Sequence, residues 1–163
     1  MRRVVTGHDE QGRSVVVADG ELDSFPTGEG GNLAWTVWGR DDTAHYPDGG
    51  EQPSADAVFP PVGGCRVTMV RLVPGATKEF DAFVASGLPE FADPARPGMH
   101  RTASLDYDIV LEGTIGLELD GQEVLLRPGD IVVQNGTRHR WHNRGSEPAT
   151  MAVIEIGAHH AAM

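Results

Sequence analysis

The chain has 163 residues, 39% of them hydrophobic and 23% charged, which is enough for one domain with its own hydrophobic core. Its formal net charge of −11 comes mostly from residues 1–65, where eleven acidic residues stand against four basic ones. This charge gives no electrostatic basis for binding nucleic acid or an anionic membrane, so both partners are excluded.

Cysteine content and hydrophobic patterning indicate a compartment. Cys65 is the only cysteine, so neither an intramolecular disulfide nor a thiolate-rich zinc or iron–sulfur site can form. The basic start of the chain is not followed by an apolar segment of signal length, and no apolar run reaches about 18 residues. The sequence therefore predicts a cytoplasmic protein that does not span a membrane.

Residues 1–65 are predicted to be an extension packed on the main domain. Val4–Thr6 and Ser14–Val17 flank a turn-forming segment, a pattern that predicts a β-hairpin, and residues 19–31 are predicted to be loop. Leu33–Trp38 is a further predicted strand.

The middle of the chain alternates between irregular and extended segments. Residues 39–64 hold four prolines and many acidic residues, a composition that predicts a surface excursion. Arg66–Val73 is predicted to be a strand that ends at the turn Pro74–Gly75. Residues 77–98 are predicted to be loop with one helical turn around Glu79–Ala85, and this insert is a candidate lid.

From residue 105 onward, short β-prone segments alternate with glycine-containing turns. The expected strands are Tyr107–Leu111, Thr114–Leu119, Glu123–Arg127, Ile131–Val133, His139–Asn143 and Ala149–Ile156. No long helical periodicity is present. The pattern predicts an all-β fold, an antiparallel jelly-roll β-barrel over residues 66–157, with the hairpin extension before it and a tail at residues 158–163.

The segment Gly98–Gly113 resembles the first motif of the cupin superfamily, His-x-His-x3-Glu-x6-Gly. Every spacing matches. His100 stands at the first position, Thr102 replaces the second histidine, and Asp106 replaces the glutamate. The first motif is therefore degenerate.

The segment Pro128–Asn143 resembles the second cupin motif, Pro-x-Gly-x2-His-x3-Asn. His139 occupies the histidine position, while Gln134 replaces the proline and the gap from Gly129 is one residue shorter than usual. The resemblance covers roughly residues 66–157 and indicates a small single-domain cupin.

The resemblance implies that both motifs direct side chains into the barrel, where His100, Asp106 and His139 would hold a divalent metal such as Fe, Mn, Ni, Co or Zn. In this version Asp108 or a bound water moves protons. Without metal, the two histidines would exchange protons directly beside Asp106. The resemblance also implies a homodimer.

Alternation along the predicted strands selects candidates for substrate binding. On the strand of the second motif, His139, Trp141 and Asn143 share the inward face, and the opposite face carries the basic side chains Arg138, Arg140 and His142, which are predicted to be solvated. Trp141 is a candidate wall for an aromatic substrate, Thr102 a candidate polar contact, and Arg71 a candidate ligand for a carboxylated substrate.

The leading hypothesis from the sequence is an enzyme that transforms a small organic molecule, with aromatic or polyketide-like compounds as candidate substrates. Its reaction would be metal-dependent oxygenation, or acid–base isomerisation, dehydration or decarboxylation. A non-catalytic small-molecule-binding module is the alternative. No nucleotide or flavin is expected, because the cluster Gly28–Gly31 lacks the strand-to-helix context of a phosphate-binding loop.

Overall fold

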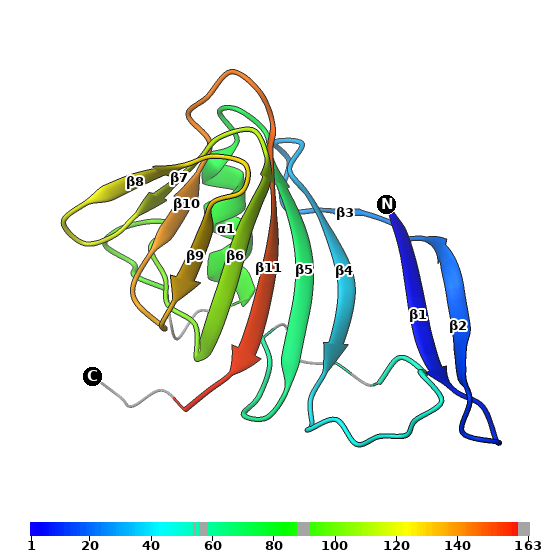
Figure 1. The fold of residues 1–163 in the computed structure, drawn as a ribbon. Helices are drawn as coiled ribbons and strands as arrows, with labels where there is room; N and C mark the ends of the chain where they lie inside the picture. The colour runs from blue at the N-terminus through cyan, green and yellow to red at the C-terminus, as the bar shows by residue number, and fades with distance from the viewer. Residues whose placement is uncertain (54, 56–58, 88–91, 160–163) are drawn as a thin grey trace.

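The computed structural model describes residues 1–53, 55, 59–87 and 92–159, in which the strands form three antiparallel sheets (Figure 1). The first half of the chain contains β1 (Arg2–His8), β2 (Ser14–Glu21), β3 (Phe25–Pro26), β4 (Leu33–Arg40), β5 (Cys65–Leu72) and α1 (Thr77–Gly87). The second half contains β6 (Ser104–Glu112), β7 (Ile115–Glu118), β8 (Glu123–Leu126), β9 (Ile131–Gln134), β10 (Arg140–His142) and β11 (Ala149–Gly157).

Two of the sheets form the barrel. The larger has the strand order β3-β4-β5-β11-β6-β9, and the smaller has the order β10-β7-β8. The largely buried hydrophobic side chains between them include Leu72, Val110, Ile115, Leu117 and Met151. The predicted all-β antiparallel barrel is thus confirmed, and its strand alternation follows the inward and outward faces of the pleat.

A glycine ends β6 where another part of the backbone comes close. Gly113 follows β6 with a φ of +69°, a conformation that favours glycine, and a Cβ there would lie 2.3 Å from the carbonyl oxygen of Pro148. Glycine at this turn therefore leaves room for the connection between β10 and β11.

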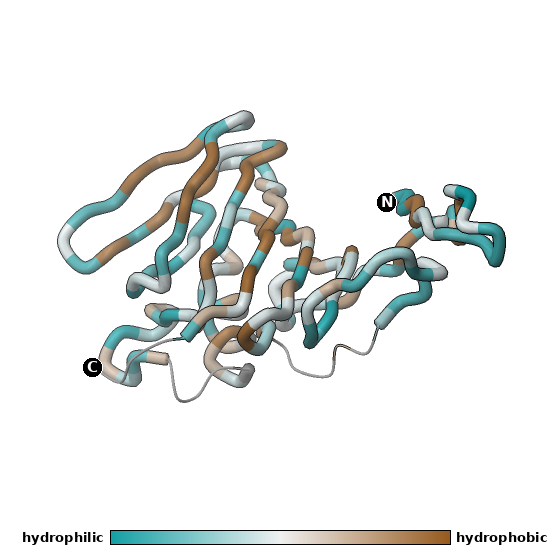
Figure 2. The backbone as a smooth tube through the Cα atoms, turned by 60° about the horizontal axis from the view of Figure 1, so that its bottom comes forward, coloured by the Kyte–Doolittle hydropathy of each residue, from teal (hydrophilic) through white to brown (hydrophobic). Residues whose placement is uncertain are grey.

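The hairpin β1–β2 is a sheet of its own beside β4 (Figure 1). Arg3 connects the hairpin to β4, because its guanidinium donates a 3.0 Å hydrogen bond to the Val37 carbonyl and lies 5.9 Å from the centroid of the Trp38 ring. Figure 2 shows that hydrophobic residues gather along the barrel strands, whereas the hairpin turn is mostly hydrophilic.

The structure differs from the loop predicted over residues 19–31. β2 extends to Glu21, and β3 lies within this range and pairs with β4, so both β3 and β4 belong to the large sheet. Strand pairing between segments distant in sequence, here β4 with β5, decides this membership, and local composition does not reveal it.

The insert after β5 also differs from expectation. The single helical turn expected around residues 79–85 is the three-turn helix α1, which buries Phe80 in the barrel core. Asp81 of this helix forms a 2.7 Å ion pair with Arg140 of β10, so α1 is anchored as part of the barrel wall. Residues 88–91 of the proposed lid lie outside the described residues. Within the described residues, no helix has the length and apolar character needed to span a membrane.

Candidate functional site

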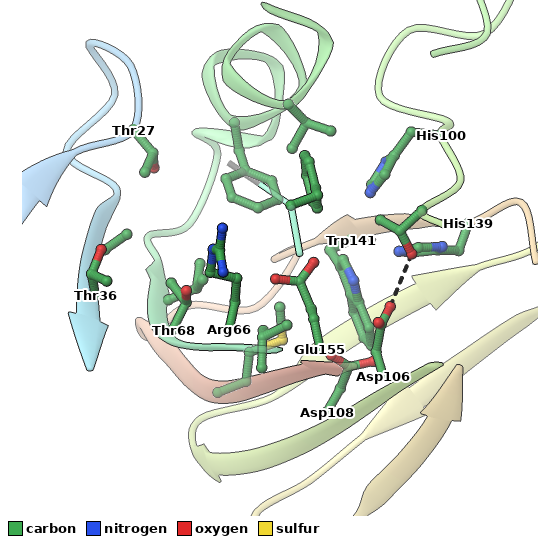
Figure 3. Close-up of a pocket in the computed structure, with 18 of the residues that line it drawn as sticks. Thr27, Thr36, Arg66, Thr68, His100, Asp106, Asp108, His139, Trp141 and Glu155 are labelled. Carbon is green, nitrogen blue, oxygen red and sulfur yellow. Dashed lines mark hydrogen bonds between the residues drawn. The ribbon is translucent and has the colours of Figure 1, made fainter. Parts of the chain in front are cut away.

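A cavity of about 360 Å³ lies inside the barrel and is lined by both sheets and α1 (Figure 3). Residues directly opposite each other on paired strands point to the same face of a sheet. On the inner face of the large sheet, such partners form three successive rows of side chains that run across the strands.

The polar row consists of Arg66, Glu155, Asp106 and Gln134. Arg66 of β5 pairs in register with Glu155 of β11, Glu155 with Asp106 of β6, and Asp106 with Gln134 of β9. All four residues are buried, and the first three line the cavity. Gly39 of β4 continues the row, and a Cβ there would lie 3.0 Å from the Arg66 side chain, so glycine leaves room for that long side chain.

Polarity falls along the next two rows. The mixed row contains Thr68, Val153 and Asp108, and the apolar row contains Val70, Met151 and Val110. The apolar row belongs to the hydrophobic core together with Trp141 and Phe80, which also line the cavity. The cavity therefore has a polar end and an apolar end.

His100 and His139 are held together by their own backbones. Each donates its amide N–H to the other's carbonyl, at 2.9 and 2.8 Å, and their ring centroids are 4.3 Å apart. Figure 3 shows both rings on one side of the cavity, with Arg66 and Thr68 on the other. The two cupin-like motifs are thus joined at their histidines.

Backbone carbonyls fix the tautomer of both rings. The Nδ1 of His100 lies 2.9 Å from the Gly98 oxygen, and the Nδ1 of His139 lies 2.9 Å from the Thr137 oxygen. Because a carbonyl only accepts, each Nδ1 carries the hydrogen and each Nε2 keeps its lone pair. Burial lowers the pKa of His139 to about 3, with the His100 ring adding to the shift, and burial also lowers the pKa of His100. Both imidazoles are neutral at physiological pH.

Three carboxyl groups reach the cavity from the large sheet. Asp106 accepts a 3.1 Å hydrogen bond from the Thr102 hydroxyl (Figure 3). Burial raises the pKa of Asp108 to about 8, and the neighbouring Asp106 adds to this. Burial likewise raises the pKa of Glu155 to about 8, assisted by both aspartates and opposed by Arg66. Asp108 and Glu155 therefore favour their protonated forms.

Comparison with known proteins identifies the family. The sequence profile of the "Cupin domain" family matches residues 92–155. The chain is also 31% identical over 157 residues to the "Cupin-domain-containing oxidoreductase fogC" of Aspergillus ruber, a match that covers 93% of this chain and 70% of that protein. This chain belongs to the cupin family.

Two further similarities cover a part of the sequence or the fold alone. The chain is 54% identical over 54 residues to "Phomopsin biosynthesis cluster protein C'" of Diaporthe leptostromiformis, a match that covers 30% of this chain and 29% of that protein. Among solved structures, it is similar to KdgF from Halomonas sp. with a TM-score of 0.46 and 18% identity, covering 82% of this chain and 86% of that one.

The trio that the cupin motifs imply as metal ligands does not form a three-ligand centre in this cupin. Within the part of the chain that the structure describes, no three His, Cys, Asp or Glu side chains are grouped closely enough to share a metal ion. Asp106 instead uses one carboxyl oxygen to accept the Thr102 hydrogen bond. Protein-built catalytic zinc sites commonly supply three ligands, and two imidazoles fall short of that number. The arrangement of the residues therefore does not fit the expected metal.

The cupin brings together most of the residues selected from its sequence. His100, Thr102, Asp106, Asp108, His139 and Trp141 all line the cavity. Arg71 does not, because it lies on the exposed face of β5 and is not part of the cavity lining. On β5 the arginine that faces the cavity is Arg66.

The opposite face of β10 is also less solvated than expected. His142 is only 2% exposed, and a Cβ added to Gly116 would lie 2.0 Å from its ring, so the glycine makes space for the imidazole. Asn143 on the inward face is buried, where its amide donates hydrogen bonds to the carbonyls of Leu72 and Glu147. Its role is therefore to join β5 to the β10–β11 connection.

Sequence reasoning missed two polar members of the cavity wall, Glu155 and Arg66. Glu155 follows Met151 and Val153 at alternate positions of an otherwise apolar strand, and this single acid on an inward face was the available signal. Residues from the excursion and from α1, Phe59 and Val84, also line the cavity.

Proposed function

We propose that this cupin is an enzyme that transforms a small, largely apolar organic molecule by proton transfer inside the barrel cavity. The observation that carries the proposal is the histidine pair, whose Nε2 lone pairs have no hydrogen-bond partner among the described residues while both Nδ1 atoms are held by carbonyls. A fixed tautomer with an available Nε2 is the form of imidazole that accepts a proton.

The proposed reaction uses side chains on both sides of the cavity. Nε2 of His100 accepts a proton from a carbon next to a substrate carbonyl, and the C–H electron pair becomes the C=C bond of an enol. His139, whose pKa of about 3 makes it a weak base, holds the His100 backbone and ring in place. A protonated buried carboxyl, Asp108, donates a proton to the carbonyl oxygen. The protonated histidine returns its proton to a different carbon, and a hydroxyl of the enol returns a proton to Asp108. Both side chains regain their starting forms, and the isomerisation needs no oxidant.

A second candidate is oxidation of the same kind of molecule. It is supported by the names of relatives, "Cupin-domain-containing oxidoreductase" in Aspergillus ruber and in Hypocrea virens. The Hypocrea virens protein is 44% identical over 66 residues, which span 38% of this chain and 34% of that protein. Oxygen uptake in the presence of a bound aromatic compound separates this candidate from proton transfer.

Deuterium incorporation tests the proton-transfer proposal. The probe is 2-hydroxy-1-phenylethanone in D2O, a neutral aromatic ketone with acidic C–H bonds, followed by proton NMR. We expect the parent protein to accelerate exchange over buffer, and His100→Asn and His139→Asn to lose the acceleration. His142→Asn is the matched control, because this buried histidine of β10 faces away from the cavity. Exchange no faster than in buffer with the parent would contradict the proposal.

Three other properties inferred from the sequence stay predictions: the homodimer, the cytoplasmic location and the domain division at residues 65 and 66. Light scattering tests the first. Elemental analysis of protein purified without added metal tests the disagreement between the described residues and the expected divalent metal.

A further inference from the structure

The polar end of the cavity contains more acidic groups than a proton-transfer pair requires. Asp106, Asp108 and Glu155 all line it, and Arg66 is the one basic side chain, apart from the two histidines, among the described lining residues. This surplus of acids constrains the chemistry of a ligand that enters.

Two of these carboxyl groups have an oxygen without a partner. Oδ1 of Asp106 and Oδ2 of Asp108 are buried and form no hydrogen bond within the described residues. Each residue is only 3% exposed and faces the cavity. Buried polar atoms normally find partners, and an unsatisfied one destabilises the fold until a donor reaches it. The two carboxyl groups are therefore placed to form hydrogen bonds with a ligand.

Arg66 is already engaged by other groups. Its guanidinium donates to the carbonyls of Arg40 and Cys65 at 2.8 and 2.9 Å and forms an ion pair with Asp41. Its positive charge also acts on Glu155, its cross-strand partner on β11, and opposes the rise in the pKa of that carboxyl. A carboxylate ligand would consequently lose its hydration at this end of the cavity without gaining a dedicated basic partner.

The apolar end of the cavity determines what kind of surface the body of a ligand can have. Val70 and Met151 of the apolar row, together with Phe80 and Trp141, present buried hydrophobic surface. Such a wall binds aliphatic or aromatic surface and leaves polar substituents unsatisfied. A ligand must therefore be polar at one end and apolar at the other.

We infer that the cavity selects a molecule with an apolar body and a hydrogen-bond-donating head, a hydroxyl or an amine, which Asp106 and Asp108 hold, and that it rejects the same body carrying a carboxylate. This inference rests on the proposed function only in treating the cavity as the substrate site. It also reverses the expectation of a carboxylated substrate bound by Arg71.

Three probes with one aromatic body test the inference: 2-naphthalenemethanol, 2-naphthalenemethylamine and 2-naphthoate, titrated into the whole protein by calorimetry at neutral pH. We expect the alcohol or the amine to bind at least about tenfold more tightly than the carboxylate, a difference of about 1.4 kcal/mol. The alcohol and amine arms distinguish a neutral from a cationic head. Equal or tighter binding of naphthoate, or no binding of any probe, would overturn the inference.

Two variants assign the selection to the carboxyl groups. Asp106→Asn keeps the side-chain shape but replaces an acceptor oxygen with an amide donor, so the preference against naphthoate should fall about tenfold. Asp108→Asn replaces a carboxyl that is already protonated and should lower the preference less. Glu112→Gln is the control, since Glu112 lies on the same strand and is exposed. Circular dichroism confirms that each variant is folded. An unchanged preference in both folded aspartate variants would contradict the assignment.

The binding test and the exchange test fail separately. A protein that binds the alcohol selectively but exchanges no deuterium retains the inference and loses the proposed function. A protein whose histidines are required for exchange but which prefers naphthoate shows the reverse.

Discussion

The two sides of the cavity solve the same problem of burial in different ways. On the histidine side, His100 and His139 are buried as neutral rings whose Nδ1 hydrogens are bound by their own loops. On the carboxyl side, Asp106 and Asp108 are equally buried, but each retains an oxygen without a partner. Burial shifts the pKa of both kinds of group toward the neutral form. The Nδ1 hydrogens of the histidine side are thus satisfied before a ligand arrives, whereas its Nε2 lone pairs and the unpartnered oxygens of the carboxyl side are left for the ligand.

The largest expected effect comes from removing the packing behind the histidine side. Trp141 is 5% exposed, and its ring meets His139 edge-on with centroids 5.9 Å apart. Trp141→Ala should lower the free energy of unfolding by about 3–5 kcal/mol, measured by urea denaturation. Trp38→Ala is the control, a half-buried tryptophan of β4 that does not line the cavity. A smaller loss in Trp141→Ala than in Trp38→Ala would show that the histidine side is loosely packed.

The pH dependence of stability separates the two sides by sign. The pKa values of Asp108 and Glu155, about 8 in the folded protein, exceed the unfolded values of about 4, so the folded state binds more protons and its stability falls as pH rises between these limits. The pKa of His139, about 3, lies below its unfolded value of about 6.5, so its contribution increases with pH in that lower range.

Between about pH 6.5 and 8 the carboxyl side acts alone, and the free energy of unfolding should decline. Glu155→Gln should flatten that decline by up to about 1.4 kcal/mol per pH unit, whereas Glu112→Gln should not change it. Chemical denaturation across this range provides the measurement. Parallel curves for the parent and Glu155→Gln would contradict the raised pKa of Glu155.

The smallest expected effect concerns the contact between Thr102 and Asp106. Thr102→Val removes the hydroxyl that donates to Asp106 and should lower the free energy of unfolding by about 1 kcal/mol. Thr102→Ser retains the hydroxyl and should stay close to the parent. Equal losses in the two variants would show that packing of the Thr102 methyl, rather than the hydrogen bond, stabilises this part of the carboxyl side.

The sequence predicted the parts of the cavity that depend on local pattern. Motif spacing and strand alternation selected His100, Asp106, His139 and Trp141, because each lies within a short segment whose inward face can be recognised alone. Glu155 joins Asp106 only through the register of β11 with β6, which is a non-local property.

The choice between Arg66 and Arg71 shows the same limit. Strand alternation puts Arg66 and Arg71 on opposite faces of β5. Which of the two faces points inward is determined by the pairing of β5 with β11 and β4. The helix α1 was underestimated for a related reason. Its first turns are stabilised by burying Phe80 in the core, and tertiary packing of this kind overrides a weak local helical pattern.

The most direct test of the central claim is the rate of deuterium exchange into 2-hydroxy-1-phenylethanone by parent, His100→Asn and His142→Asn. Proton transfer by the histidine side predicts that His100→Asn lowers the catalysed rate by about 10²–10⁴-fold, while folded His142→Asn stays near the parent. A His100→Asn rate within a few-fold of the parent would contradict the account.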